Sequence, residues 1–181
     1  MPRFTIKQLA TALQSYPPLR SNQYEVYIQP PQALGGGLGG PYFASSVQFP
    51  GRSLATVERR TFGPQRDMPY ERLFSGDLDI TFTLTKGGFM RDYFEKWMDE
   101  IIDPETNRIK NSRERYLGEL QIDVTGTDGS TEYGITVLEV FPKSISPVQL
   151  SYRSENEVLE QPVSFSFRDY RQRNVLESST I

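Results

Sequence analysis

Residues 77–85, with the sequence DLDITFTLT, decide how this chain folds. Large apolar side chains alternate with Asp and Thr along the whole stretch, which is the period of a β-strand with one buried face and one wetted face. Lys86-Gly87-Gly88 then interrupts the strand, because consecutive glycines disfavour regular structure. The chain therefore contains at least one strand of an amphipathic sheet, and the segments on both sides must supply its neighbours.

Residues 89–102 (FMRDYFEKWMDEII) follow this strand directly. Their aromatic and aliphatic side chains recur at helical spacing, with charged side chains between them. Asp103-Pro104 ends the pattern, because proline cannot continue a helix. We expect the main helix of the protein here. Its aromatic stripe is expected to pack in the core, since a cofactor site would need polar groups that converge on it.

Further alternating patterns predict strands before and after this strand and helix. They cover residues 24–29, 43–49, 56–62, 119–125, 133–141, 148–152 and 161–170. Asp128-Gly129 is a strong hairpin signal between two of them. Strands and helices do not alternate as they do in βαβ proteins. The sequence therefore predicts a mainly β fold, an antiparallel β-barrel or sandwich of about seven strands with one main α-helix at about 89–102.

The two ends of the chain differ from this central part. Residues 5–8 have the T-x-x-Q spacing of a capping box, and apolar side chains recur on one helical face as far as Leu13. A short N-terminal helix is expected, ending before Pro17-Pro18. It would belong to an N-terminal arm or pack on its own domain. The expected division is an arm at 1–20, a β domain at 21–170 and a C-terminal tail at 171–181.

The amino-acid composition excludes many classes of enzyme. The 181 residues contain no Cys and no His, which excludes disulfides, thiolate or imidazole catalysis and nearly every zinc, haem or iron–sulfur site. The net charge of −3 is not that of a nucleic-acid-binding surface. The charge is uneven, however: residues 1–118 carry two more basic than acidic side chains, and residues 119–181 carry five more acidic than basic ones. Opposite surfaces could attract copies of the chain to one another.

No membrane segment is expected. No apolar run approaches the ~18 residues that a spanning helix needs, and the first residues lack the continuous apolar stretch of a signal peptide. We expect an intracellular protein with no membrane partner.

Residues 52–72 form an unusually basic excursion, interrupted by Gly63-Pro64 and Pro69. Its arginines are Arg52, Arg59, Arg60, Arg66 and Arg72. A long solvated loop would explain the segment. Loops beyond ~12–15 residues are uncommon in compact domains, however, and they tend to be functional. We therefore treat the excursion as a candidate contact site.

Enzymatic alternatives rest on weak signals. Residues 35–40 contain G-x-G-x-x-G, but Pro41 follows where a dinucleotide site needs a helix. Asp77 and Asp79 could act as a pair of catalytic carboxylates, although acids are common on wetted strand faces. With Asp123 they could also bind a hard cation, yet no calcium-loop motif supports this. We expect no enzyme, no cofactor and no metal site, and a carboxylate hydrolase is the minor alternative.

The order of the predicted elements resembles the tail tube protein of contractile-tailed bacteriophages, which is related in fold to the tube protein of type VI secretion systems. The resemblance runs from about residue 20 to 170. It is carried by QYEVYI at 23–28, FPGR at 49–52, residues 60–83, RDYFEKW at 91–97, VFPKSI at 140–145 and VSFSF at 163–167. The order of these pieces, more than any one of them, makes the resemblance.

The resemblance implies a structural subunit that forms hexameric rings, which stack into a hollow tube conducting DNA. It implies that the loop at 51–74 reaches the adjacent ring, so that its five arginines meet acidic surface. Polar strand faces would line the bore, and the candidate lining residues are Asp77, Asp79, Glu119 and Asp123. A mildly acidic lining would let DNA slide, because it repels phosphates. The main helix would cover the other side of the barrel.

The partners implied by the resemblance are identical copies, tail sheath and baseplate proteins, and DNA that is not specifically bound. The location implied is the virion tail, assembled in the host cytoplasm. A baseplate protein that initiates the tube shares the same core and is one alternative. A monomeric β-barrel binding module is another.

Overall fold

The computed structural model describes residues 5–15, 18–35, 44–60, 63–74, 76–151 and 158–173. The helical elements are α1 (Ile6–Ser15), η1 (Gln32–Leu34), α2 (Phe89–Ile101) and α3 (Arg113–Tyr116). The strands are β1 (Tyr24–Gln29), β2 (Ala44–Val47), β3 (Arg52–Arg59), β4 (Arg66–Phe74), β5 (Asp77–Thr83), β6 (Gly118–Thr125), β7 (Thr131–Ile145), β8 (Glu160–Ser166) and β9 (Asp169–Arg173). The mainly β, antiparallel fold predicted from the sequence is confirmed.

The main sheet has seven strands in the order β1-β6-β7-β8-β5-β2, and β9 pairs with β7. β7 belongs to both parts of the sheet: its first half pairs with β6 and β9, and its second half pairs with β8. Glu139 lies where the pairing changes, with a positive φ of 55°. Two guanidinium groups hold its carboxylate there, Arg113 at 3.1 Å and Arg168 at 2.8 Å. β7 therefore forms the corner at which the sheet folds over into two layers.

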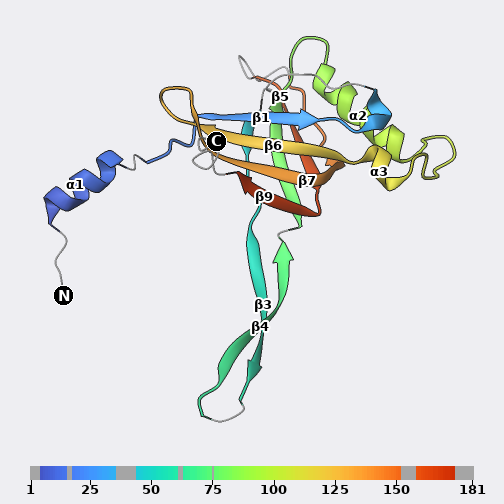
Figure 1. The fold of residues 1–181 in the computed structure, drawn as a ribbon. Coiled ribbons are helices and arrows are strands. Elements are labelled where there is room, and N and C mark those ends of the chain that lie inside the picture. Colours follow the sequence, from blue (N-terminus) through green and yellow to red (C-terminus); the bar gives the residue numbers. More distant parts are fainter. Residues whose placement is uncertain are drawn as a thin grey trace, which may run out of the picture.

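The two layers cross one another (Figure 1). β1, β6, β7 and β9 form one layer, and β5 runs across behind it. The sheet is not closed into a barrel, because among the described strands none pairs with the second side of β1 or of β2. The Tyr24 hydroxyl donates to the carbonyl of Ala44 at 3.0 Å, so a side chain, and no backbone ladder, connects these two edges. Of the barrel and the sandwich that the sequence left open, the chain by itself adopts an open sandwich.

Aromatic side chains fill the space between the layers. Phe82 of β5 packs on Phe94 of α2 with ring centroids 5.0 Å apart, and both are fully buried. Trp97 of α2 is also fully buried, and its indole N–H donates to the carbonyl of Tyr116 at 2.8 Å. A Cβ at Gly118 would lie 2.8 Å from the Trp97 ring, so only glycine lets β6 start this close. The expectation that the helix at 89–102 packs its aromatic stripe in the core is therefore confirmed.

Several strand predictions need correction. The strand expected at 56–62 instead begins at Arg52 and ends at Arg59, and residues 61–62 lie outside the described residues. The strand expected at 148–152 does not form over residues 148–151, where Leu150 is 81% exposed; Tyr152 lies outside the described residues. β7 instead continues to Ile145, because a register shift beside Pro142 accommodates the missing N–H. The single strand expected at 161–170 is two strands, β8 and β9. They pair with different halves of β7, so the chain must turn between them.

The N-terminal helix forms as expected and stands clear of the body (Figure 1). The backbone N–H of Thr5 donates to the Gln8 side chain at 3.0 Å, which is one half of the predicted capping box. Ile6 and Leu13 on its apolar face are 85% and 52% exposed. The apolar face of this helix is therefore not packed on the body of the molecule. No helix among the described residues has the length and apolar character needed to cross a bilayer.

Candidate assembly site

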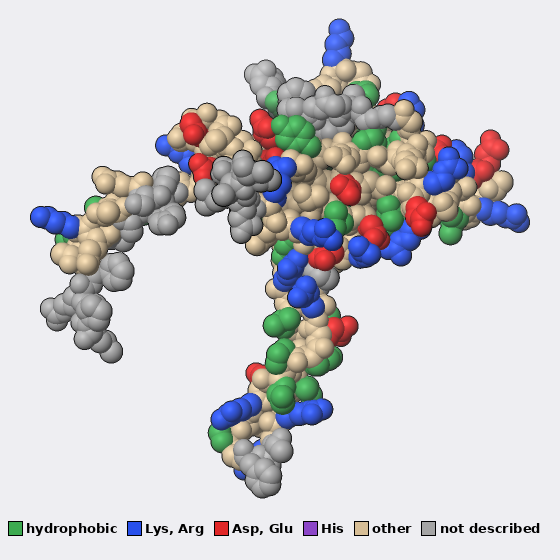
Figure 2. Space-filling model, viewed as in Figure 1, with side chains coloured by type: hydrophobic (Ala, Val, Ile, Leu, Met, Phe, Trp, Pro, Cys, Tyr) green, Lys and Arg blue, Asp and Glu red, His purple; other side chains and the backbone are tan. Residues whose placement is uncertain are grey.

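The basic excursion forms a β-hairpin that projects from the body of the molecule (Figures 1 and 2). β3 and β4 pair antiparallel from Arg52 opposite Phe74 to Arg59 opposite Arg66. The partners of Ala55 and Thr56 are Glu71 and Pro69, so Tyr70 is the extra residue of a bulge in β4, and a strand tolerates proline beside such a bulge. Apart from Ala55, every described side chain in the two strands is exposed. A long solvated loop is therefore not what this segment forms. It is a β-hairpin whose two faces beyond Arg52 are largely exposed in the described part of the chain.

Arg52 fixes the base of the hairpin to the body. Its guanidinium donates to the carbonyl of Tyr170 at 2.5 Å and to the carboxylate of Asp169 at 3.3 Å, and it lies 4.2 Å from the centroid of the Tyr170 ring. Both partners belong to β9. Of the five arginines proposed for stacking, Arg52 is thus already engaged within its own chain. These contacts of Arg52 can hold the hairpin at a fixed angle to the body.

Three of the other arginines gather at the free end of the hairpin (Figure 2). Arg59 and Arg66 are direct cross-strand partners, and Arg60 donates to the carbonyl of Gly63 in the turn at 3.3 Å. Arg72 lies nearer the base, opposite Leu54. The structure therefore concentrates positive charge at the tip, the part that can reach furthest from the body.

The four candidate lining residues occupy two separate surfaces. Asp77 and Asp79 lie on β5, where Lys143 reaches Asp77 at 2.7 Å and the Ser164 hydroxyl donates to Asp79. Glu119 and Asp123 lie on β6, in the other layer. The strand neighbours of both pairs point into the shared core, so the two polar faces point away from one another. One pair can face a given channel, and the structure does not bring all four together.

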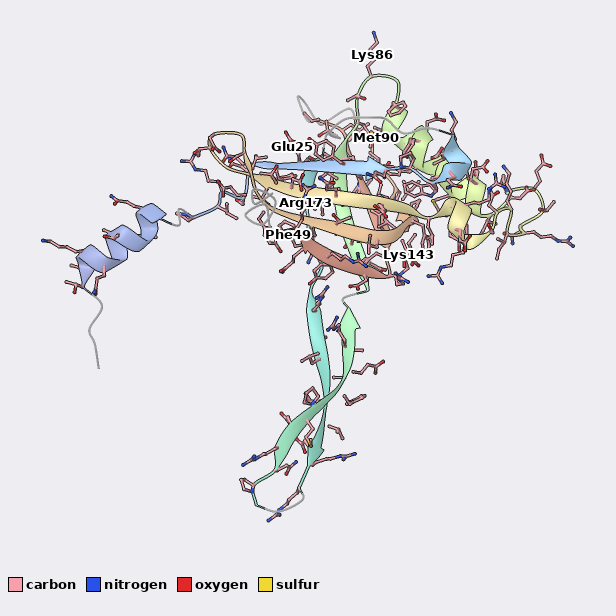
Figure 3. The ribbon with its side chains drawn as sticks, in the orientation of Figure 1. Glu25, Phe49, Lys86, Met90, Lys143 and Arg173 are labelled. Carbon is pink, nitrogen blue, oxygen red and sulfur yellow. The ribbon has the colours of Figure 1, made fainter. Side chains whose placement is uncertain are left out.

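Asp123 is the most enclosed of the four, with only 4% exposure. Both of its carboxylate oxygens accept from the Arg173 guanidinium, at 2.7 and 2.6 Å, and Gln121 donates to it at 2.7 Å. Glu25, Asp123, Gly134 and Arg173 are successive partners across β1, β6, β7 and β9, and Figure 3 shows the two outer members of this row at the same end of the sheet. The acid is therefore neutralised within the chain.

Sequence reasoning missed Arg173, because it assigned residues 171–181 to a tail. The first three of these residues complete β9, and residues 174–181 lie outside the described part of the chain. A signal was available in the sequence. Arg171 and Arg173 fall on the strand face opposite to Tyr170, so the alternating pattern continues for three residues beyond Tyr170.

An apolar cavity of about 430 Å³ opens between the two free sheet edges. Its lining comes from the segment between α1 and β1, from β1, β6 and β7, and from the segment around β2. The lining residues are Leu19, Arg20, Ser21, Gln23, Tyr24, Val47, Phe49, Ile122, Val124 and Tyr133. Burial raises the pKa of Tyr24. None of these residues carries a carboxylate, and the lining is mainly apolar.

The remaining perturbed groups are structural. The hydrogen bond from Lys110 to Glu100, at 2.5 Å, lowers the pKa of that carboxyl and fixes the loop after α2. A hydrogen bond to Glu25 raises the pKa of the Tyr27 hydroxyl. No group of three or more acidic side chains among the described residues could hold a metal ion. The features available for contact with other chains are the unpaired strand edges, the β3–β4 hairpin and the polar sheet faces.

Several solved structures share this fold. A chain of the sheath–tube complex of an extracellular contractile injection system matches with a TM-score of 0.66 and 15% identity, over 96% of this chain and 100% of that one. The sheath/tube terminator of the same system matches at 0.64 and 16%, over 86% and 96%. The tube-terminating cap of the anti-feeding prophage matches at 0.65 and 15%, over 87% and 92%. At these identities the matches establish the fold.

No curated protein matches the sequence. A family model described as phage tail tube protein does match it, over residues 19–173. The match starts between α1 and β1 and ends with β9, so it includes the β3–β4 hairpin and both layers of the sandwich. It supports a structural role in a tube, as a component of a virion tail. The chain belongs to the phage tail tube protein family.

Proposed function

We propose that this protein is the repeating subunit of a phage tail tube. Six copies would form a ring, and rings would stack into a hollow tube that conducts DNA to the host. Tail sheath and baseplate proteins would be its further partners in the virion. The tube would assemble in the host cytoplasm, and no catalysis would be involved. The family match and the contractile-system neighbours support the structural role.

The open sheet is the single observation that carries this proposal. β1 and β2 each present a row of backbone donors and acceptors without a strand on one side. An exposed strand edge pairs readily with another chain, and a head-to-tail contact that repeats with a suitable rotation closes a ring. If β1 of one copy pairs with β2 of the next, six copies make one continuous inner β-barrel from sheets that are each open.

The hairpin supplies the second contact that a tube needs. β3 and β4 project from the body, and their tip carries Arg59, Arg60 and Arg66. We propose that the tip reaches the adjacent ring and meets acidic surface from residues 119–181, the half of the chain with five excess acidic side chains. Arg72 and Arg52, nearer the base, would orient the β3–β4 hairpin.

The bore would be lined by one polar sheet face. Asp77 and Asp79 are the proposed lining residues on the β5 side, with Glu119 and Asp123 as the alternative on the opposite side. Asp77 and Asp123 each have a cationic partner in the chain, which leaves Asp79 or Glu119 as the acidic charge of a mildly acidic lining. A weakly charged wall would let DNA pass, because it lacks the dense cations by which binding proteins hold phosphates.

A role at the end of the tube is the alternative within the family. The terminator and cap structures match this chain about as well as the chain of the sheath–tube complex does. A body subunit should add rings without limit, whereas an end subunit should stop at one ring or require another protein. A monomeric binding module would show neither behaviour.

Electron microscopy of the purified protein over a range of concentrations tests the proposal. We expect six-fold rings at low concentration and tubes of varied length at high concentration. Single rings at every concentration would favour the end subunit. A strict monomer at high concentration would overturn the assembly proposal.

A further inference from the structure

We propose that the tip of the β3–β4 hairpin is a two-sided charged wedge that inserts between two neighbouring copies of the chain. This inference rests on the proposed function and names the partners of the hairpin more narrowly. One face of the tip would contact an acidic surface of one copy, and the opposite face would contact a basic surface of another.

The pairing of the two strands assigns the charges to faces. Arg59 lies opposite Arg66, and the next pair inward is Glu58 opposite Asp67. Successive residues of a strand point to opposite faces, so the two arginines share one face and the two acids share the other. Figure 3 shows side chains leaving the hairpin on both sides. In the paired part of the tip the two arginines therefore lie on one face and the two acids on the other, while Arg60 lies beyond the last pair and donates to the carbonyl of Gly63 in the turn.

This arrangement does not stabilise the hairpin by itself. Like charges directly opposite one another on a strand pair are destabilising. Neither Arg59 nor Arg66 forms an ion pair within the described residues, and neither do Glu58 and Asp67. Exchanging one Arg with one acid would give two favourable cross-strand pairs. The observed pattern instead suits a hairpin that is stabilised by what covers it.

The apolar side chains point to the same conclusion. Val57 and Met68 pair one step further from the tip than the acids, on the face that carries the two arginines. They are 42% and 50% exposed, so the positive face also offers an apolar contact. The negative face has Thr56 and Pro69 at the equivalent position. The two faces thus differ in both charge and polarity, and one flat surface cannot satisfy both.

The chain itself provides surfaces of both signs. Residues 119–181 are acidic, with exposed carboxylates such as Glu119 and Glu160, and Lys86, Arg91 and Arg171 are exposed cations outside the hairpin. In a ring, neighbouring copies place different parts of this uneven surface next to each other at every boundary between subunits. A boundary with one acidic and one basic wall fits the wedge. We therefore assign the tip to the boundary between two copies in the next ring.

A charge exchange tests the assignment. The fourfold variant Glu58→Arg, Arg59→Glu, Arg66→Glu, Asp67→Arg keeps the net charge and the number of like-charge pairs of the hairpin but reverses the sign of both faces. We expect it to form rings and to lose stacked tubes by at least about tenfold in a sedimentation assay, because each face then meets its own sign. Tubes at the wild-type level would overturn the inference.

The same variant separates two kinds of contact. If hairpins paired with one another, positive face on negative face, reversing both faces in every copy would restore the match and tubes would form. Reversing one face alone, as in Arg59→Glu with Arg66→Glu, would block tubes in either case. If the wild-type protein itself forms no tubes, the proposed function fails, and that outcome differs from a failure of the wedge.

Cross-linking gives a readout that does not depend on stability. Because the sequence has no Cys, single cysteines can be placed on each face by Arg66→Cys and Asp67→Cys. Chains labelled at both positions with a photoreactive maleimide are mixed into tubes with a large excess of unlabelled chains. We expect a product in which one labelled chain joins two others, whereas each single-site variant gives two-chain products. Two-chain products alone from the doubly labelled chain would refute a two-sided site.

Discussion

Asp123 and Arg173 form a two-point ion pair across Gly134, and the missing side chain of that glycine makes the pair possible. The carboxylate and the guanidinium belong to β6 and β9, which are separated by β7. A Cβ at Gly134 would lie 2.5 Å from an Asp123 oxygen and 3.4 Å from the Arg173 Nε. An acid that looks from the sequence like free charge on a polar face is thus covered by the last residue of the last strand.

Arg173→Ala should destabilise the folded subunit. Asp123 is almost fully buried and would lose its cationic partner, so we expect the free energy of unfolding to fall by about 2 to 3 kcal/mol. Urea denaturation of unassembled protein measures this. Arg171→Ala, an exposed residue of the same strand, is the matched control, with an expected change within about 0.5 kcal/mol. Equal losses for both variants would refute a special role of the pair.

Arg52→Ala should weaken stacking while rings persist. The guanidinium binds the hairpin to Tyr170 and Asp169. Its loss should let the hairpin change its angle to the body of the molecule. Arg52→Lys should rescue poorly, because an ammonium cannot stack flat on the Tyr170 ring and bind both partners. Faster hydrogen exchange in β3 and less sedimenting tube would be measured together. Full rescue by lysine would contradict the positioning role.

Arg59→Glu combined with Arg60→Glu should leave rings intact and block their polymerisation, because the reversed tip meets acidic surface on the next ring. Negative-stain microscopy and light scattering report rings and tubes separately. Arg91→Glu, an exposed arginine on α2, is a control for the change in charge. An unchanged tube length in the double variant would argue against stacking through the tip.

Asp77→Lys with Asp79→Lys should slow DNA passage without blocking assembly, since two cations per subunit would turn the β5 face into an anion-binding wall. The rate of DNA ejection from reconstituted particles measures this. Glu119→Lys lies on the oppositely directed face and should have no effect if β5 faces the bore. If Glu119→Lys slows ejection and the Asp77 and Asp79 variant does not, the lining is the β6 face.

The loop after α2 should become less stable in acid. Because hydrogen bonds from Lys110 and Asn111 lower the pKa of Glu100 below its ordinary value of 4.5, the folded state holds this carboxylate more firmly than the unfolded chain does. The stabilisation is therefore present above pH 4.5 and is lost as the pH falls through the lowered pKa. Melting curves of the wild type and Glu100→Gln should converge on acidification. A gap that persists at about pH 2 would exclude this carboxylate as the cause.

Local patterns were sufficient for much of the fold. Alternation along residues 77–83 and helical spacing along 89–101 identified β5 and α2, because each pattern reflects which side of one element is buried. The capping-box spacing likewise located α1. The family resemblance, which depends on the order of such elements, was found from the sequence and is confirmed by the family match.

The errors arose where long-range pairing decides. Whether 148–152 becomes a strand depends on a free place beside β7, and whether 161–170 is one strand or two depends on the corner at Glu139. The basic excursion was singled out as a candidate contact site, but its pairing into a hairpin joins residues that no short window contains. Arg173 was missed for the same reason: its partner lies 50 residues away.

The amino-acid order alone determined β5, α1 and α2, the absence of Cys and His chemistry, and the uneven charge, because these depend on composition and on neighbours within a few residues. The tertiary structure alone decided that the sheet stays open, that Arg52 holds the arm, and that the charges at its tip divide between two faces. These features depend on the register between distant strands, and a single step of register moves every side chain to the opposite face.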